Sequence, residues 1–200
     1  MHQRLSITIH TVLLLFFVFL FSTNSFSQYI FKESSLPKEL SLHNFTTVAD
    51  VGQRNLNIED VMANYQSLDP KKLKTENDDL GFTQNNFWAK VELKNPTNTA
   101  LQYYFETARP ITDLVELYIV DGASGKIVKK VSGDIMRYSE RSFDNRKSIF
   151  ELKIQPQSHI KLFLHLKSDG EVIKIPVMLY SSENFIKMIS NEQLFFVFNQ

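Results

Sequence analysis

The stretch FWAKVELK, residues 87–94, decides the fold class because apolar and polar side chains alternate along it. Every second residue from Phe87 to Leu93 is apolar, whereas three of the four residues on the other face, which ends at Lys94, are charged. Successive side chains of a β-strand point to opposite faces of a sheet. This period of two therefore predicts a strand with one face turned toward a core.

The same pattern recurs on both sides of this stretch, with turn residues such as Asn95-Pro96 and Asp121-Gly122 between the repeats. The predicted further strands are residues 101–106, 113–120, 126–131, 150–154, 160–166 and 172–180, with one more near residues 40–48. About seven short strands at regular spacing are typical of an antiparallel β-sandwich or barrel. We favour the sandwich, and hence a mainly β fold.

The composition is that of an ordinary globular protein, with 43% hydrophobic and 22% charged residues. The 22 Lys and Arg residues balance the 22 Asp and Glu residues, so no net charge favours nucleic acid as a partner. Without cysteine, the chain forms neither a disulfide framework nor a thiolate zinc site. The apolar core alone must therefore hold the fold.

The first 27 residues have the layout of a secretory signal peptide. Arg4 precedes an apolar run, VLLLFFVFLF at residues 12–21, and the small residues Ser25 and Ser27 lie just before the predicted cut. Cleavage leaves Gln28 as the new N-terminus, and the mature chain acts outside the cytoplasm. The alternative is an uncleaved membrane anchor, which needs about 20 apolar residues, more than this run supplies.

A short helix is predicted at residues 57–62, where Asn57 is the N-cap and two acids occupy the first turn. The charged stretch 69–79 follows it and is predicted to be a surface loop. We expect this loop to separate an N-terminal preamble, residues 28–84, from the main sandwich, residues 85–180.

The last segment, residues 181–200, is predicted to be an exit helix capped by Ser181 or Ser182. It closes with the apolar run LFFVF at residues 194–198. One interpretation is that a transmembrane helix begins here and that the domain, residues 28–185, is a fragment of a longer membrane receptor. The alternative is an amphipathic turn folded back on the sandwich.

Four pieces of the chain occur in the order seen in a bacterial sensor family. They are FWAKVELKNPTN, ARPITDLVELYIVDG, SGDIMRYSERSFDNRKSIFELKIQP and LFLHLKSDGEVIKIPVMLYSSENF. Together they resemble the second type of extracellular domain of the 7TMR-DISM receptors, which are seven-transmembrane receptors with diverse intracellular signalling modules. The weaker match of IEDVMAN extends the resemblance over residues 30–190.

This resemblance implies a periplasmic jelly-roll domain, similar in fold to carbohydrate-binding modules. In the family such a domain is followed by seven membrane helices and a cytoplasmic output such as a histidine kinase or a cyclase. The present sequence stops where the first of those helices would begin, so the output activity is not carried over to it. A homodimer is left open.

Trp88 is the first candidate ligand-binding residue. It is the only tryptophan and lies on the face opposite Phe87 and Leu93. An aromatic ring on an open sheet face can stack on the apolar face of a sugar. The alternative, which we favour, is that Trp88 packs beneath the N-terminal preamble.

The second group of candidates lies in the charged segment between Gly133 and Lys147. Asp134, Tyr138, Arg141 and Arg146 offer hydrogen-bond donors and acceptors that suit a polyol or an acidic sugar. Asp134, Arg141 and Arg146 also match positions of the family pattern. The alternative is a solvated loop whose ion pairs contribute little.

No motif of a catalytic or metal site stands out. His159 and His165 share one face of a predicted strand, but six residues at about 3.3 Å each place them too far apart to hold one metal ion. The chain has no GxSxG, GxxxxGK[ST] or HExxH motif, and acid pairs such as Asp78 with Asp79 suit a solvated loop. We therefore predict no cofactor, no metal and no enzyme activity.

The sequence thus predicts a non-catalytic, periplasmic ligand-sensing domain that binds a carbohydrate or another small polar molecule. It would pass the signal to a membrane region downstream. Two alternatives stay open: a secreted or envelope-attached adhesive module, and a jelly-roll glycosidase with two facing carboxylates.

Overall fold

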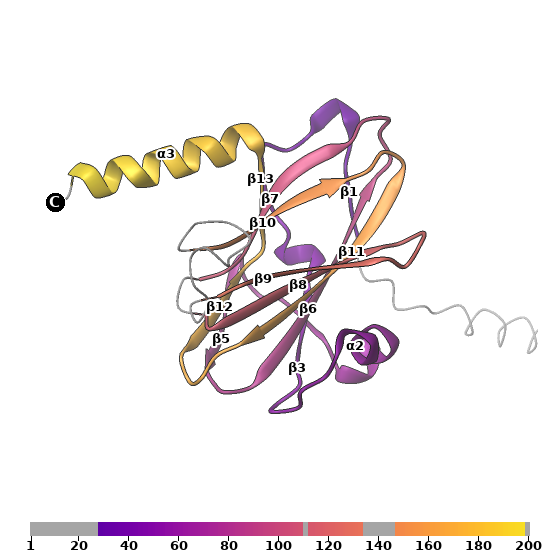
Figure 1. Cartoon of the computed structure of the whole chain (residues 1–200), viewed down its shortest axis with the longest axis vertical. Helices are drawn as coiled ribbons and strands as arrows, with labels where there is room; N and C mark the ends of the chain where they lie inside the picture. The colour runs from indigo at the N-terminus through magenta and orange to yellow at the C-terminus, as the bar shows by residue number, and fades with distance from the viewer. Residues whose placement is uncertain (1–27, 110–111, 134–146, 199–200) are drawn as a thin grey trace, which may run out of the picture.

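The computed structural model describes residues 28–109, 112–133 and 147–198 and is a β-sandwich from which one helix extends (Figure 1). The strands in these residues are β1 (Tyr29–Ile30), β2 (Glu39–Ser41), β3 (Thr47–Asp50), β4 (Lys71–Lys72), β5 (Asn77–Phe82), β6 (Asn86–Asn95), β7 (Leu101–Ala108), β8 (Leu114–Asp121), β9 (Ile127–Ser132), β10 (Ser148–Ile154), β11 (Ser158–Lys167), β12 (Val172–Pro176) and β13 (Met178–Ser181). The helices are η1 (Glu33–Ser35), η2 (His43–Phe45), α2 (Ile58–Asn64), η3 (Tyr65–Leu68) and α3 (Ser182–Phe198).

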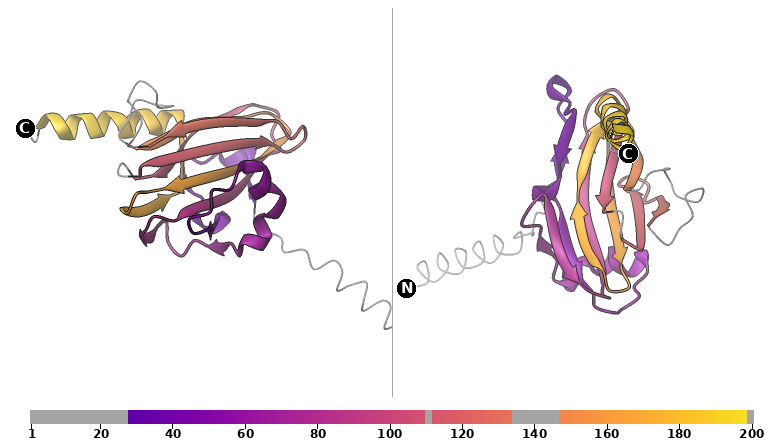
Figure 2. Two further views of the ribbon diagram at one scale, coloured as in Figure 1. Left: turned by 60° about the horizontal axis from the view of Figure 1, so that its bottom comes forward. Right: turned by 90° about the vertical axis from the view of Figure 1, so that its left-hand side faces the viewer.

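Two sheets form the layers of the sandwich. The larger has seven strands in the order β4-β3-β6-β11-β8-β9, and β1 joins it by parallel pairing with β6. The smaller has four strands in the order β10-β7-β13-β2, and β12 with β5 makes a two-stranded ribbon. The other strand pairs are antiparallel. Figure 2 shows the layers stacked, with α3 running away from them.

The alternation in residues 87–94 sets the core as predicted. The apolar residues of β6 from Phe87 to Leu93 are at most 5% exposed and pack between the sheets. Strand β11 pairs with β6 along its whole length, and Leu162 lies opposite Val91. The expected mainly β, jelly-roll-like antiparallel sandwich is therefore confirmed.

A second apolar cluster covers the outer face of the larger sheet. Trp88, Tyr118 and Phe163 point away from the main core and pack against Ile58 and Val61 of α2. The helix starts as predicted, because the Asn57 side chain accepts a hydrogen bond from the Asp60 backbone N–H at 2.7 Å. This N-terminal segment therefore closes much of a face that the sequence pattern left open.

The predicted loop at residues 69–79 was wrong. Its start forms β4, which pairs with β3, and its end forms β5, which pairs with β12. Both are held by backbone pairing and have no apolar alternation, so the sequence pattern did not indicate them.

Two predicted strands are each divided in the structure. Residues 172–180 form β12 and β13, which pair with different partners on either side of Val177. Residues 40–48 are interrupted by η2, so that β2 joins the smaller sheet and β3 joins the larger one.

Turn residues named in the sequence have specific structural roles. The buried Asn95 side chain donates to three backbone carbonyls and accepts from Thr97, which fixes the turn after β6. Gly133 has a φ of +130°, and a Cβ there would lie 2.1 Å from the Asp113 carbonyl oxygen. Only glycine fits this position.

The helix α3 begins at Ser182, directly after β13, as expected for the exit helix. The Ser181 hydroxyl accepts a hydrogen bond from the Asn184 backbone N–H at 3.4 Å. In the part of the chain that the structure describes, no helix combines the length and the apolar character needed to cross a bilayer.

Candidate functional site

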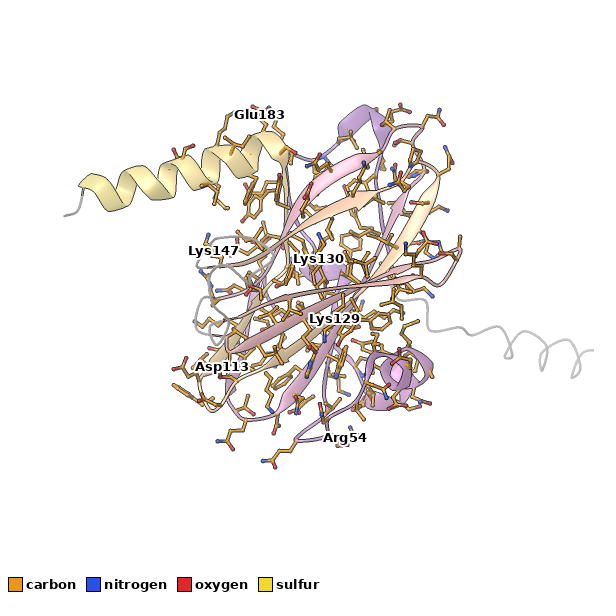
Figure 3. All side chains as sticks on the ribbon, in the orientation of Figure 1. Arg54, Asp113, Lys129, Lys130, Lys147 and Glu183 are labelled. Carbon is orange, nitrogen blue, oxygen red and sulfur yellow. The ribbon has the colours of Figure 1, made fainter. Side chains whose placement is uncertain are left out.

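A cavity of about 440 Å³ lies between the outer face of the smaller sheet and α3. Its sheet side is formed by Glu39 of β2, Tyr180 of β13 and Lys147, which precedes β10. Figure 3 shows Lys147 below α3 and Glu183 on the helix. Three segments that are distant in sequence thus meet at one polar hollow.

Strand alternation places a buried carboxylate beside this cavity. In β7, Phe105 points into the core and Glu106 points to the outer face, where it is only 4% exposed. The Tyr180 hydroxyl donates to Glu106 Oε2 at 3.2 Å, and Lys147 Nζ lies 3.7 Å from the same oxygen. A buried carboxylate requires such partners, because removing it from water is costly.

The helix α3 supplies the opposite wall of the cavity. Asn184, Lys187, Met188 and Asn191 line it, at the i, i+3, i+4 and i+7 spacing of a single helix face. The helix is anchored by Phe185, whose ring stacks on Tyr104 of β7 with centroids 3.9 Å apart and planes at 11°. The anchor is close to the cavity, and the rest of α3 extends beyond the sandwich (Figure 1).

Glu183, in the first turn of α3, forms two exposed salt bridges. Lys187 Nζ lies 2.6 Å from Glu183 Oε1, and Lys38 Nζ lies 3.6 Å from Glu183 Oε2. The hydrogen bond from Lys187 lowers the pKa of the Glu183 carboxyl, and the charges of both lysines add to the effect. Lys187 is therefore shared between the helix surface and the cavity wall.

The cavity combines acceptors and donors of both charges. The lining carboxylate is that of Glu39, the ammonium groups are those of Lys147 and Lys187, and the amides come from α3. Glu106 is buried beside the cavity, where it holds Tyr180 and Lys147 in place. Such a mixture can bind the hydroxyl groups of a polyol, since each hydroxyl both donates and accepts.

Trp88 lies far from this cavity, on the outer face of the larger sheet, and is 1% exposed. Its ring stacks on His165 with centroids 4.7 Å apart and planes at 10°, and it packs on Tyr118 at 5.6 Å. The candidate ligand-stacking role of Trp88 is therefore not supported by its position. The structure places Trp88 beneath the N-terminal segment, which is the alternative that we favoured from the sequence.

His165 belongs to a buried polar network on the same face. Its Nδ1 lies 2.8 Å from Glu116 Oε2 and its Nε2 lies 2.9 Å from Asn86 Oδ1. Lys129 Nζ lies 2.6 Å from the other Glu116 oxygen. The hydrogen bond from His165, followed by the contacts with Lys129, lowers the pKa of Glu116 to about 2.

The other predicted ligand-binding residues, Asp134, Tyr138, Arg141 and Arg146, lie outside the described residues. Within residues 28–109, 112–133 and 147–198, no three His, Asp or Glu side chains gather in a way that could hold a metal ion.

Glu106 and Tyr180 were not among the sequence candidates. The one available signal was that Glu106 follows Phe105 near the end of a strand rich in aromatic residues, so that it occupies an outward position in β7. The position of the first turns of α3 beside this face depends on contacts between segments far apart in sequence, and no local pattern indicated it.

Comparison with protein-family profiles gives a match to "7TMR-DISM extracellular 2" over residues 44–181, which is more than half of the chain. The chain belongs to this family. The match covers β3 to β13, which include the sheet side of the cavity except Glu39. This 7TMR-DISM extracellular 2 domain has no match among curated proteins at the level of sequence.

Among solved structures, the domain has weak similarity to two carbohydrate-binding modules and an insecticidal protein. TmCBM61 in complex with β-1,4-galactotriose is 12% identical, with a TM-score of 0.33, over 53% of this chain and 69% of that one. CsCBM6-3 from Clostridium stercorarium, in complex with cellobiose, is 12% identical, with a TM-score of 0.28, over 54% and 83%. The insecticidal crystal protein Cry2Aa is 9% identical, with a TM-score of 0.31, over 50% and 16%.

Proposed function

We propose that this domain is the non-catalytic ligand-sensing part of a bacterial seven-transmembrane signalling receptor and that it acts on the periplasmic side of the inner membrane. Membership of the 7TMR-DISM extracellular 2 family supports an extracellular receptor domain. One structural observation carries the sensing role. The cavity has the sheet as one wall and the exit helix α3 as the other, so a ligand in it contacts both.

The proposed ligand is a carbohydrate or another small polar molecule. Glu39 and Tyr180 at the sheet and Asn184 on α3 offer acceptors and donors for hydroxyl groups. The volume of about 440 Å³ falls within the roughly 300–1,000 Å³ typical of small-molecule sites.

The signal would travel through α3. A ligand shifts a conformational equilibrium only if it binds one state better than the other. A ligand that contacts both Tyr180 and the Lys187 face of α3 favours the helix position that keeps both contacts. Release of the ligand leaves the helix held by Phe185 and the salt bridges of Glu183.

The roles of Asp134, Tyr138, Arg141 and Arg146 in binding remain part of this proposal. Lys147, which follows their segment directly in the sequence, lines the cavity. We propose that these side chains add contacts to the same ligand.

The test is isothermal titration of the soluble domain against a panel of glycans and small metabolites. A compound from the panel should give a saturable heat, and Glu106→Gln and Lys147→Gln should each weaken its binding at least about tenfold. Lys153→Gln is the matched control, because Lys153 is exposed on β10 and does not line the cavity.

Two other outcomes would contradict the proposal. Heat only with an envelope protein or polymer would favour the adhesive module. Hydrolysis of chromogenic glycosides that is lost on replacing Glu39 or Glu106 would favour a glycosidase.

A further inference from the structure

A second, smaller cleft of about 200 Å³ lies on the opposite side of the sandwich, between α2 with η3 and the outer face of β6 and β11. Its helix side is lined by Met62, Tyr65 and Gln66, and its sheet side by Lys90, Lys161 and Phe163. It shares no lining residue with the cavity beneath α3. The volume is below the roughly 300–1,000 Å³ of sites for drug-sized ligands, so it suits a small molecule.

The aromatic walls of this cleft are rigid. The Tyr65 hydroxyl donates to the backbone carbonyls of Thr47 and Trp88, at 2.9 and 3.2 Å. The Tyr65 ring meets Phe163 edge to face, with centroids 5.8 Å apart and planes at 80°. A site whose walls are already fixed loses little entropy when it binds a ligand.

The charged groups of the cleft carry one excess positive charge. Lys90 Nζ lies 2.7 Å from Glu92 Oε1 and 5.8 Å from the centroids of both aromatic rings. Lys161 lies directly across from Glu92 in the β6–β11 register and is half-buried. The Glu92 carboxylate pairs with Lys90, whereas Lys161 has no salt-bridge or hydrogen-bond partner among the side chains that the structure describes.

We propose that this cleft binds a small carboxylate with an aromatic or similarly flat apolar body. The ligand carboxylate would lie between Lys90 and Lys161. Its negative charge would balance the one excess positive charge of Lys90, Lys161 and Glu92. The flat body would lie against Phe163 and Met62, which is 37% exposed at the mouth of the cleft. This site is independent of the ligand site proposed beneath α3.

The test is an NMR titration of the soluble domain with phenylacetate, observed at the Met62 methyl group. Saturable shifts are expected, and Lys161→Gln should weaken binding at least about tenfold. Lys94→Gln is the matched control, because Lys94 is an exposed lysine on the same face of β6 that does not line the cleft. Glu106→Gln, beside the cavity beneath α3, should leave phenylacetate binding unchanged.

Two further probes decide the ligand class. Phenylacetamide, a neutral isostere that lacks the negative charge, should bind at least about tenfold more weakly than phenylacetate. Inorganic sulfate, which has negative charge but no flat apolar body, should also bind at least about tenfold more weakly than phenylacetate. Met62→Glu, which adds a like charge at the mouth, should also abolish binding. Because this variant lacks the Met62 methyl group, its binding is followed by backbone amide shifts, and it provides a second test should Lys161→Gln fail to fold. No saturable shift in the folded wild-type domain, or equal binding of sulfate and phenylacetate, would overturn the proposal.

Discussion

The two outer faces of the sandwich are built in opposite ways. On the larger sheet, α2 covers a stack of Trp88, His165 and Tyr118, and Glu116 is held between His165 and Lys129. On the smaller sheet, α3 touches the outer face mainly through Phe185 and leaves a polar cavity beside it. Apart from the small cleft beside Lys90 and Lys161, the first face is closed by the packing of α2, whereas the second keeps charged groups beside a larger open space.

This difference indicates how one rigid fold can combine stability with response. The closed face joins the N-terminal segment to the sheet through fully buried side chains, so it should open only when the whole domain unfolds. The α3 face has few buried contacts, so it can change without disturbing the core. Substitutions on the two faces test this contrast.

The largest effect is expected for Trp88→Ala. Removing a ring that is 1% exposed should lower the free energy of unfolding by about 3–5 kcal/mol. Urea denaturation followed by circular dichroism measures this. Phe82→Ala is the control, since Phe82 is 81% exposed and should change stability by no more than about 0.5 kcal/mol. Similar effects of the two substitutions would show that the closed face is not a second core.

Glu116→Gln should lower the free energy of unfolding by roughly 1–3 kcal/mol at neutral pH, because Lys129 and His165 lose a charged partner. In the folded protein the Glu116 pKa is about 2, against an ordinary 4.5. The carboxylate therefore stabilises the fold above pH 4.5, and this contribution is lost as the pH falls from 4.5 toward 2.

Unfolding curves at a series of pH values for the wild type and Glu116→Gln test this linkage. The difference between the two proteins should shrink below pH 4.5. Glu151→Gln is the control, because Glu151 is exposed on β10 and its difference from the wild type should stay small at every pH. A Glu116→Gln difference that does not depend on pH would rule out the charged form as the source of the stability.

On the open face, Tyr180→Phe removes the hydroxyl that donates to the buried Glu106 carboxylate. The expected cost is about 0.5–1.5 kcal/mol in the free energy of unfolding, less than for Glu116→Gln. The loss in the binding free energy of the sensed ligand should be much larger than the loss in the free energy of unfolding. A loss of stability as large as that of Trp88→Ala would mean that this face is structural.

The smallest effect on global stability is expected for Phe185→Ala, because this ring anchors only the start of α3, on Tyr104. Hydrogen exchange at the first turn of α3 should become at least about tenfold faster, while the amides of β7 keep their protection. Ile186→Ala is the matched control on the same turn, since Ile186 is 64% exposed. Equal exchange in both variants would show that the stacking does not hold the helix.

The sequence was most informative where periodicity is long. In the ten-residue strands β6 and β11 every second residue is apolar over most of the strand, so their inward residues, such as Leu93 and Leu164, could be assigned from the sequence. Strands of two to four residues, such as β1 and β4, are too short to show a period. Their positions are set by backbone pairing with longer neighbouring strands, and this pairing cannot be predicted from the residues of the short strands themselves.

The site was harder to predict than the fold. Glu106 is one acid at the end of an aromatic strand, and only its contacts with Tyr180 and Lys147, which line the cavity, connect it to the site. Trp88 illustrates the converse. An aromatic residue on the polar face of a strand could bind a ligand or be covered by another segment, and here α2 covers it.

The most direct test of the account measures whether ligand binding changes the position of α3. The chain contains no cysteine, so Ser190→Cys on α3 and Lys153→Cys on β10 allow two nitroxide labels to be placed without background. Pulsed electron paramagnetic resonance then gives the distance distribution between them, with and without saturating amounts of the compound identified by titration. The account predicts a shifted or narrowed distribution that Glu106→Gln prevents, whereas an unchanged distribution at full occupancy would contradict it.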